Sequence, residues 1–165
     1  MKKFGILLIV LIGFTTFSYA QTSATTNASA TIVGTLALTK TTDLQFGNLS
    51  SPVGASTVTI AADPSSTTTP AGGIALLGGI ARTAATYHVT GTATATYAIT
   101  LPAGTIPLGT MTVGSFVSSY AGTSNIGTIQ NTATDDFIVG ATLNVGAGQA
   151  PGVYTGTYQV SIAYN

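Results

Sequence analysis

The sequence predicts an all-β protein made of two packed antiparallel sheets with about eight short strands. Thr, Val, Ile and Tyr, which favour strands, are abundant, whereas Glu is absent and Lys and Arg are scarce. Apolar and polar residues alternate along several segments, and no apolar stripe of helical spacing follows the first twenty residues. Twenty Gly and six Pro divide these segments with turn signals.

The amino-terminal segment predicts export. Two lysines precede an apolar run over residues 4–14, which is too short to cross a bilayer. Ser18 and Ala20 then place small residues at the positions that a signal peptidase inspects. We therefore expect a cleaved signal peptide over residues 1–20, a single domain over residues 21–165, and a location in the periplasm, on the cell surface or outside the cell.

The first predicted strand is an apolar alternation over residues 28–38. Its apolar members are Ala28, Ala30, Ile32, Leu36 and Leu38, with Thr on the opposite face. The polar residues 40–43 are expected to interrupt it, and residues 44–49 are expected to form a second short strand.

Residues 57–79 are expected to contain a strand, a loop and an apolar run that fits either a strand or a helical turn. Residues 57–60 alternate as a strand does. Residues 63–70 are expected to form a Ser/Thr loop, because Pro at both ends excludes a central strand. The apolar run over residues 72–79 is bracketed by glycines and fits a strand or a single helical turn, and its length favours the strand.

The middle of the chain repeats this pattern of strands and loops. Strands are predicted over residues 85–90, 96–101 and 111–116. Residues 103–109 are expected to form a loop, and the long polar stretch over residues 118–130 is expected to be another.

Two clear strands end the chain. The first, over residues 137–145, has its apolar face formed by Phe137, Val139, Ala141, Leu143 and Val145. The second, over residues 152–165, has one face formed by Tyr154, Gly156, Tyr158, Val160, Ile162 and Tyr164. Each strand is expected to bury one face and to expose the other.

The charge of residues 21–165 excludes several classes of partner. Lys40 and Arg82 are the two cationic side chains, and they are outnumbered by Asp43, Asp63, Asp135 and Asp136. Such a surface offers no basic stripe to nucleic acid and no cationic face to anionic lipid. Weak charge repulsion also tolerates self-association. The chain has no Cys, so disulfides cannot contribute to its stability.

No pattern of catalytic or metal-binding residues is present, and we expect no enzyme activity, metal or cofactor. His88 is the one histidine, and its alternation with Thr directs it to solvent. Asp135 and Asp136 could supply oxygen ligands to a hard cation, but the spacing of a calcium loop is missing. A solvated turn at the start of a strand explains them better. The tyrosines fit buried strand positions better than a sugar-stacking platform.

The order of the strand and turn motifs resembles a family of exported bacterial proteins of undefined function, with short Thr- and Gly-rich chains. The motifs are Asn27 to Val33, Asp43 to Gly47, Gly72 to Gly79, Tyr87 to Gly91, Tyr97 to Pro102, Gly140 to Val145 and Gly152 to Tyr158.

More distantly, the layout is similar to spore coat protein U and to the archaic chaperone–usher pilins. The shared features are an alternating first strand, the Leu-x-Phe-Gly segment at residues 44–47 and a terminal Gly-x-Tyr strand. The resemblance implies an incomplete immunoglobulin-like sandwich that accepts a strand from its neighbour and polymerises. The pilins usually hold a disulfide near the first strand and carry a longer donor extension than residues 21–27.

Two functions are consistent with these observations. In the first, the chain is a structural subunit of a fibre or coat that assembles by strand addition, as a homo-oligomer and with a periplasmic chaperone as a further partner. The donated strand would carry Ala28, Ala30, Ile32, Leu36 and Leu38, although this strand could equally pair within its own chain. The acceptor groove would be walled by Phe137, Val139, Leu143, Val145, Tyr158, Val160 and Ile162. In the second, residues 65–70 and 118–130 present a ligand surface on a free-standing binding module.

Overall fold

A computed structural model describes residues 21–165 of the chain, so the predicted signal peptide lies outside the described residues. The chain divides into two units, one ending at Thr31 and the other formed by Ile32–Asn165. Residues 21–31 contain no helix or strand, and their side chains are exposed. All of the strands described below belong to the second unit.

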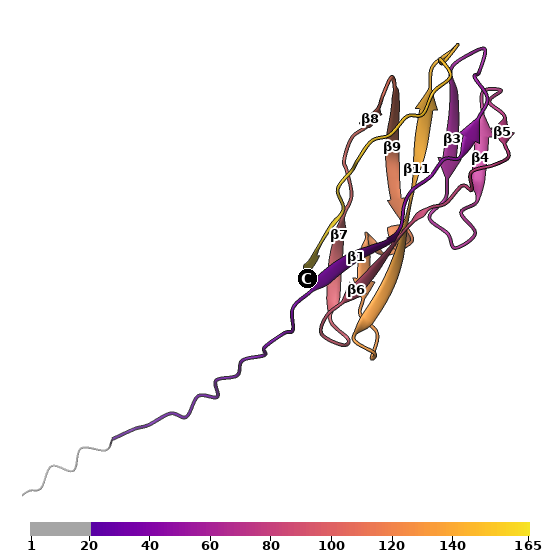
Figure 1. Ribbon diagram of the computed structural model, residues 1–165. Helices are drawn as coiled ribbons and strands as arrows, with labels where there is room; N and C mark the ends of the chain where they lie inside the picture. Colours follow the sequence, from indigo (N-terminus) through magenta and orange to yellow (C-terminus); the bar gives the residue numbers. More distant parts are fainter. Residues whose placement is uncertain (1–20) are drawn as a thin grey trace, which may run out of the picture. The chain divides into compact units, whose positions relative to one another are not determined.

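Residues 21–165 are almost entirely β-structure, which confirms the predicted fold class (Figure 1). Within residues 21–165 the one helical element is a short 3₁₀ turn, η1, at Ala121–Thr123. The strands are β1 (Ala37–Thr42), β2 (Asn48–Leu49), β3 (Ser56–Ile60), β4 (Thr68–Ala71), β5 (Leu76–Leu77), β6 (Ala85–Thr90), β7 (Thr96–Thr100), β8 (Ile106–Leu108), β9 (Met111–Ser118), β10 (Ile126–Thr128), β11 (Thr134–Val145) and β12 (Ser161–Tyr164).

The strands form three antiparallel sheets. The largest has seven strands in the order β1-β6-β11-β3-β4, with β9 also paired to β11 and β8 paired to β9. A three-stranded sheet has the order β10-β7-β12, and β2 pairs with β5. The hydrophobic core has two clusters, to both of which β11 contributes. One cluster contains residues of β3, β9 and β11, and the other contains residues of β6, β7 and β11.

Strand β11 follows the predicted alternation except at Gly140, which is buried between two buried residues. Phe137, Val139, Leu143 and Val145 are buried, whereas Asp136 and Asn144 are exposed. Its backbone pairs with β3, β6 and β9. The strand therefore joins the two core clusters and carries most of the largest sheet.

Two expected loops contain strands instead. Thr68–Ala71 forms β4, which includes Pro70, and Ile106–Leu108 forms β8, which includes Pro107. Each of these strands pairs with only one neighbour, so each is an edge strand. Proline is tolerated there because its missing N–H faces away from the ladder. The rule that excludes proline from central strands holds, but it does not exclude these segments from the sheet.

The first strand also differs from its prediction. It begins at Ala37 and continues through Lys40 to Thr42, where the sequence predicts an interruption. Lys40 lies opposite Tyr87 in the ladder, and its ammonium group contacts the carboxylate of Asp43. Because β1 is an edge strand, its charged side chain can reach water without leaving the ladder.

The polar stretch at residues 118–130 is ordered by local contacts rather than forming a featureless loop. It contains η1 and β10, and β10 pairs with β7. Ser118 and Ile129, near its two ends, are buried. Both ends of this stretch therefore pack into the body of the protein, and its middle is exposed.

Gly140 is a position in β11 where the fold leaves no space for a side chain. A Cβ atom there would lie 2.2 Å from the carbonyl oxygen of Ile60 and 2.7 Å from the backbone of Ala61. We expect Gly140→Ala to lower the free energy of unfolding by about 3 kcal/mol, because the backbone of the neighbouring strand would have to move. Urea unfolding measures the change.

The matched control is Gly146→Ala, because no atom lies within 4 Å of a Cβ placed there. We expect this control to unfold within about 0.5 kcal/mol of the unsubstituted protein. Equal stabilities for the two variants would contradict the close approach of β11 to the end of β3.

Candidate functional site

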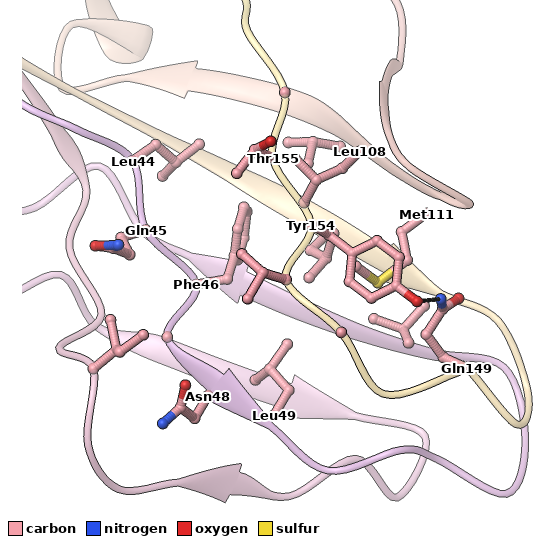
Figure 2. A pocket seen from close by; sticks show the side chains of 18 of the residues that line it. Leu44, Gln45, Phe46, Asn48, Leu49, Leu108, Met111, Gln149, Tyr154 and Thr155 are labelled. Carbon is pink, nitrogen blue, oxygen red and sulfur yellow. Dashed lines mark hydrogen bonds between the residues drawn. The ribbon is translucent and has the colours of Figure 1, made fainter.

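The body of the protein contains a groove with a volume of about 820 Å³. One rim, which we call the first rim, is formed by residues 44–51, and the second rim is formed by residues 149–158. The floor between them is apolar and comes from β8, β9 and β11. It is formed by Ile106, Leu108, Met111, Val113, Leu143 and Val145. Figure 2 shows Phe46 on the first rim and Tyr154 on the second, with Leu108 and Met111 near Tyr154.

The second rim is extended chain without a sheet partner. The predicted terminal strand spans residues 152–165, but only Ser161–Tyr164 pairs with β7. No backbone N–H or C=O of residues 151–160 makes a hydrogen bond within the described chain. Tyr154, Tyr158 and Val160 are nevertheless half-buried, and the residues between them are exposed. Over residues 151–160 the side chains therefore alternate as predicted for a strand with two different faces, but the backbone pairs with no other strand.

Some backbone groups of the first rim are paired and others are not. Gln45 exchanges two backbone hydrogen bonds with Thr83, and the N–H of Ser50 donates to the carbonyl of Ala75. Successive residues of an extended chain direct their backbone groups to opposite edges. Leu44 and Phe46 accordingly have no backbone partner within residues 21–165. Both rims of the groove therefore carry backbone groups that have no partner in the described chain.

The two rims are joined at one end of the groove. The hydroxyl of Ser51 donates to the carbonyl of Gln149 at 2.8 Å, and the N–H of Gly148 donates to the carbonyl of Pro52 at 2.8 Å. Near the same end, the Nε2 of Gln149 donates to the hydroxyl of Tyr154 at 2.6 Å (Figure 2). These contacts tie the two rims together at this end of the groove.

The predicted acceptor residues are divided between the groove and the core. Leu143 and Val145 form part of the floor, and Tyr158 lies on the second rim. Phe137 and Val139 are fully buried in the other core cluster. Val160 and Ile162 are packed against that same cluster.

Several groove residues were not among the predicted acceptors. They are Phe46, Ile106, Leu108, Met111, Val113 and Tyr154. Phe46 and Tyr154 stand on segments with a visible strand pattern, and that alternation is the signal that could have found them. The role of Ile106 and Leu108 depends on β8, which the sequence predicts as a loop.

The predicted donor residues also separate into two groups. Leu36 and Leu38 are half-buried against the core cluster that contains Phe137, and β1 pairs with β6 of the same chain. Ala28 and Ala30 are exposed and belong to no strand, and Ile32 is 95% exposed. The alternation therefore folds onto its own sheet from Leu36 onward, and residues 21–35 have no partner strand.

Some residues of the loops proposed as a ligand surface lie in strands or make local hydrogen bonds. Within residues 65–70, Thr68 begins β4 and the hydroxyl of Ser66 accepts a hydrogen bond from the N–H of Ala84. Within residues 118–130, the hydroxyl of Ser118 donates to the side chain of Asn125 at 2.6 Å.

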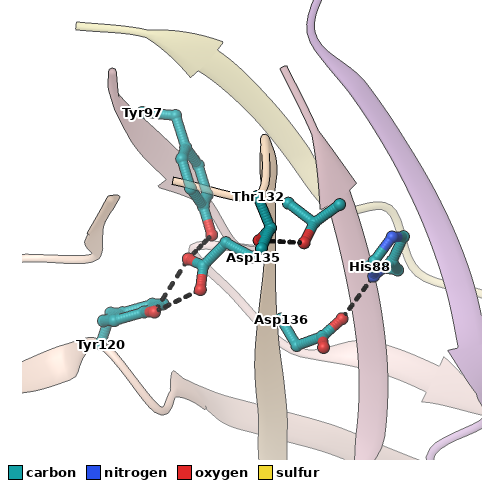
Figure 3. A network of polar contacts seen from close by, with 7 residues as sticks. His88, Tyr97, Tyr120, Thr132, Asp135 and Asp136 are labelled. Carbon is teal, nitrogen blue, oxygen red and sulfur yellow. Dashed lines mark hydrogen bonds and ion pairs between the residues drawn. The ribbon is translucent and has the colours of Figure 1, made fainter. Parts of the chain in front are cut away.

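A second cluster of polar side chains surrounds Asp135 (Figure 3). The hydroxyl of Tyr97 donates to this carboxylate at 2.7 Å, and the hydroxyl of Tyr120 donates at 2.8 Å. Asp135 is buried, so the expectation of a solvated turn is wrong for this residue. Burial, followed by the hydrogen bond to Asp135, raises the pKa of Tyr120 to about 12 and raises the pKa of Tyr97 further.

The neighbouring Asp136 has a different environment. Its carboxylate lies 2.7 Å from Nδ1 of His88, and both side chains are substantially exposed (Figure 3). Among residues 21–165, no group of three or more His, Asp or Glu side chains is placed to hold a metal ion. A search of the same residues finds no helix long and apolar enough to cross a membrane. The Asp135 cluster is accordingly a structural link between β7, β11 and the segment before η1.

We expect Tyr120→Phe to lower stability by about 1.5–3 kcal/mol near pH 7, because Asp135 loses a donor. The pKa of Tyr120 is higher in the folded state than in the unfolded state. Its contribution is therefore complete below about pH 10 and is lost as the pH rises toward about 12. Chemical unfolding at a series of pH values should show the stability difference between the two proteins narrowing above pH 10. Between pH 6 and 8 the difference should be constant, and a difference that stays constant up to pH 12 would contradict this role for Tyr120.

The comparisons with known proteins agree with the predicted resemblance at the level of the family. A family model described as a domain of unknown function (DUF4402) matches residues 36–164. Neither the curated proteins nor the solved structures contain a match to this chain. The matched region begins one residue before β1 and includes every strand and both rims of the groove. The chain therefore belongs to the DUF4402 family of domains of unknown function.

Proposed function

We propose that this protein is a non-catalytic structural subunit that assembles by strand addition, with a strand from a second copy lying in the groove. The observation that carries the proposal is the run of residues 151–160 without a backbone hydrogen bond in the described chain. Backbone groups of a folded domain are nearly always paired with other groups or with water. A sheet edge left open beside an apolar floor is a template for another strand.

An added strand would complete one layer of the sandwich. It would pair with Leu44 and Phe46 on the first rim and with alternate residues of the second rim. This pairing would connect the β2–β5 sheet to the segment that leads into β12. Its inward side chains would cover the floor formed by β8, β9 and β11. Main-chain pairing supplies affinity in such a joint, and the apolar positions supply specificity.

The amino-terminal segment of another copy has the chemistry of this strand. Residues 21–35 carry no charged side chain, and Ala28, Ala30 and Ile32 stand on one face of an extended chain. These residues make no hydrogen bond in the described structure before Gly34. Fifteen extended residues span up to about 50 Å, which exceeds the about 33 Å needed to follow ten residues of the second rim.

The surface composition fits the same role. Residues 21–165 carry few charges, and Thr, Ser and Asn supply most of the polarity. A protein of this kind has little electrostatic repulsion between copies. If the segment before Gln21 is removed during export, assembly would take place in the periplasm or on the cell surface, and we propose a fibre or a coat as the product.

The first test is peptide capture. A chain that begins at Gly34 keeps all the strands but lacks the proposed donor. We expect it to remain folded and to bind a synthetic peptide of residues 21–35, as measured by calorimetry or by a gel shift. A peptide with the same composition in scrambled order is the control. A folded chain that captures neither peptide, or both equally, would contradict strand addition through this segment.

The second test adds one negative charge to either face of the donor in the whole chain. Ala30→Asp would bury a carboxylate against the apolar floor, so we expect assembly to weaken more than about a hundredfold. Ser29→Asp adds the same charge to the opposite face and should leave assembly within about threefold of the unsubstituted protein. Light scattering after size-exclusion chromatography measures both. If the two substitutions weakened assembly equally, the proposal that one face of the donor strand lies against the apolar floor would be contradicted.

A further inference from the structure

The point where the amino-terminal segment leaves the body is held by a cluster of hydrogen bonds. We call Gly34, Thr92 and Tyr164 the exit clamp. The hydroxyl of Tyr164 accepts from the N–H of Thr92 at 2.8 Å and donates to the carbonyl of Gly34 at 3.0 Å. The N–H of Gly34 donates to the hydroxyl of Thr92 at 2.5 Å. Both backbone groups of Gly34 are thus engaged, three residues before β1 begins.

The side chains of Tyr164 and Leu36 pack closely against Gly91, beside the clamp. A Cβ atom on Gly91 would lie 2.6 Å from the hydroxyl of Tyr164 and 3.1 Å from the side chain of Leu36. Tyr164 is also the last residue of β12, where it lies opposite Tyr97. The clamp therefore ties the start of the folded body to its last strand across 130 positions of sequence.

Strand addition could fill the groove with the amino-terminal segment of the same chain or with that of a second copy. The segment ahead of Gly34 could enter the groove of its own chain if the chain reversed at residues 34–36. A three-residue turn there would place Ile32 opposite Leu38 and would bring Thr25 close to Gln45, on the first rim. A tight hairpin turn of this kind needs a residue with positive φ, which glycine supplies most easily. Gly34 does not have a positive φ in the structure, and its N–H and C=O are already bonded.

We infer that the exit clamp prevents the chain from filling its own groove and so directs strand addition to a second copy. This inference depends on the proposed function, because it concerns which copy supplies the strand. Tyr164 is then a positioning residue, which acts through Gly34 and does not contact the groove. Removing its hydroxyl frees the carbonyl of Gly34 and removes the partner of the Thr92 N–H, while the ring stays packed against the core.

The test uses the whole chain with Thr25→Cys and Gln45→Cys, which are clean probes because the chain has no other cysteine. A flexible bismaleimide then joins the two positions within one chain or between chains, and a denaturing gel separates the products. With the clamp intact, we expect products that join several chains. Tyr164→Phe should lower the ratio of interchain to intrachain product about tenfold, the effect expected from losing about two hydrogen bonds. Thr92→Val should shift the ratio in the same direction.

Tyr120→Phe is the matched control, because it also removes a tyrosine hydroxyl but lies outside the clamp. The ratio for this variant should equal that of the unsubstituted protein. Equal ratios in all four proteins, with interchain product present, would overturn the clamp and leave strand addition intact. Intrachain product alone in the unsubstituted protein would also overturn the clamp. The absence of interchain product together with a failure of peptide capture would overturn the proposed function itself.

Discussion

The pairing of β11 is the interaction on which the rest of the sandwich depends. This strand carries the apolar side chains that belong to both core clusters, and its backbone pairs with β3, β6 and β9. The close approach of Gly140 to the backbone of Ile60 allows the same strand to serve both clusters without a gap in the layer. Loss of this pairing would separate the two clusters, and neither would have enough neighbours to exclude water by itself.

The layer opposite β11 is complete over one cluster and incomplete over the other. Strands β7, β10 and β12 cover the cluster that contains Phe137. The cluster that contains Leu143 is bordered by the two rims, and the groove lies between them above the apolar floor. The groove and the unpaired backbone groups of its rims lie in the same part of the protein. One additional strand would fill the groove and pair the free backbone groups of its rims. This is the physical basis of the proposed assembly.

The few charged groups of the body have local structural partners. Asp135 is buried, yet it accepts hydrogen bonds from Tyr97 and Tyr120, which offset part of the cost of removing a carboxylate from water. Lys40 contacts Asp43, and His88 contacts Asp136. These contacts leave a surface whose polarity comes mainly from hydroxyl and amide groups, which suits close association between identical chains.

The sequence alone determined the fold class and most of the strands, because alternation with a period of two is a local property that each strand carries by itself. For that reason the sequence predicted the alternation in β11 and the inward-facing tyrosines of residues 152–165. It could not show that residues 151–160 lack a partner, since pairing depends on what lies alongside in space. It predicted loops at β4 and β8 because proline has different consequences at an edge and in the centre of a sheet. The tertiary structure decided the groove, the burial of Asp135 and the clamp at Gly34, each of which joins residues that are far apart in the chain.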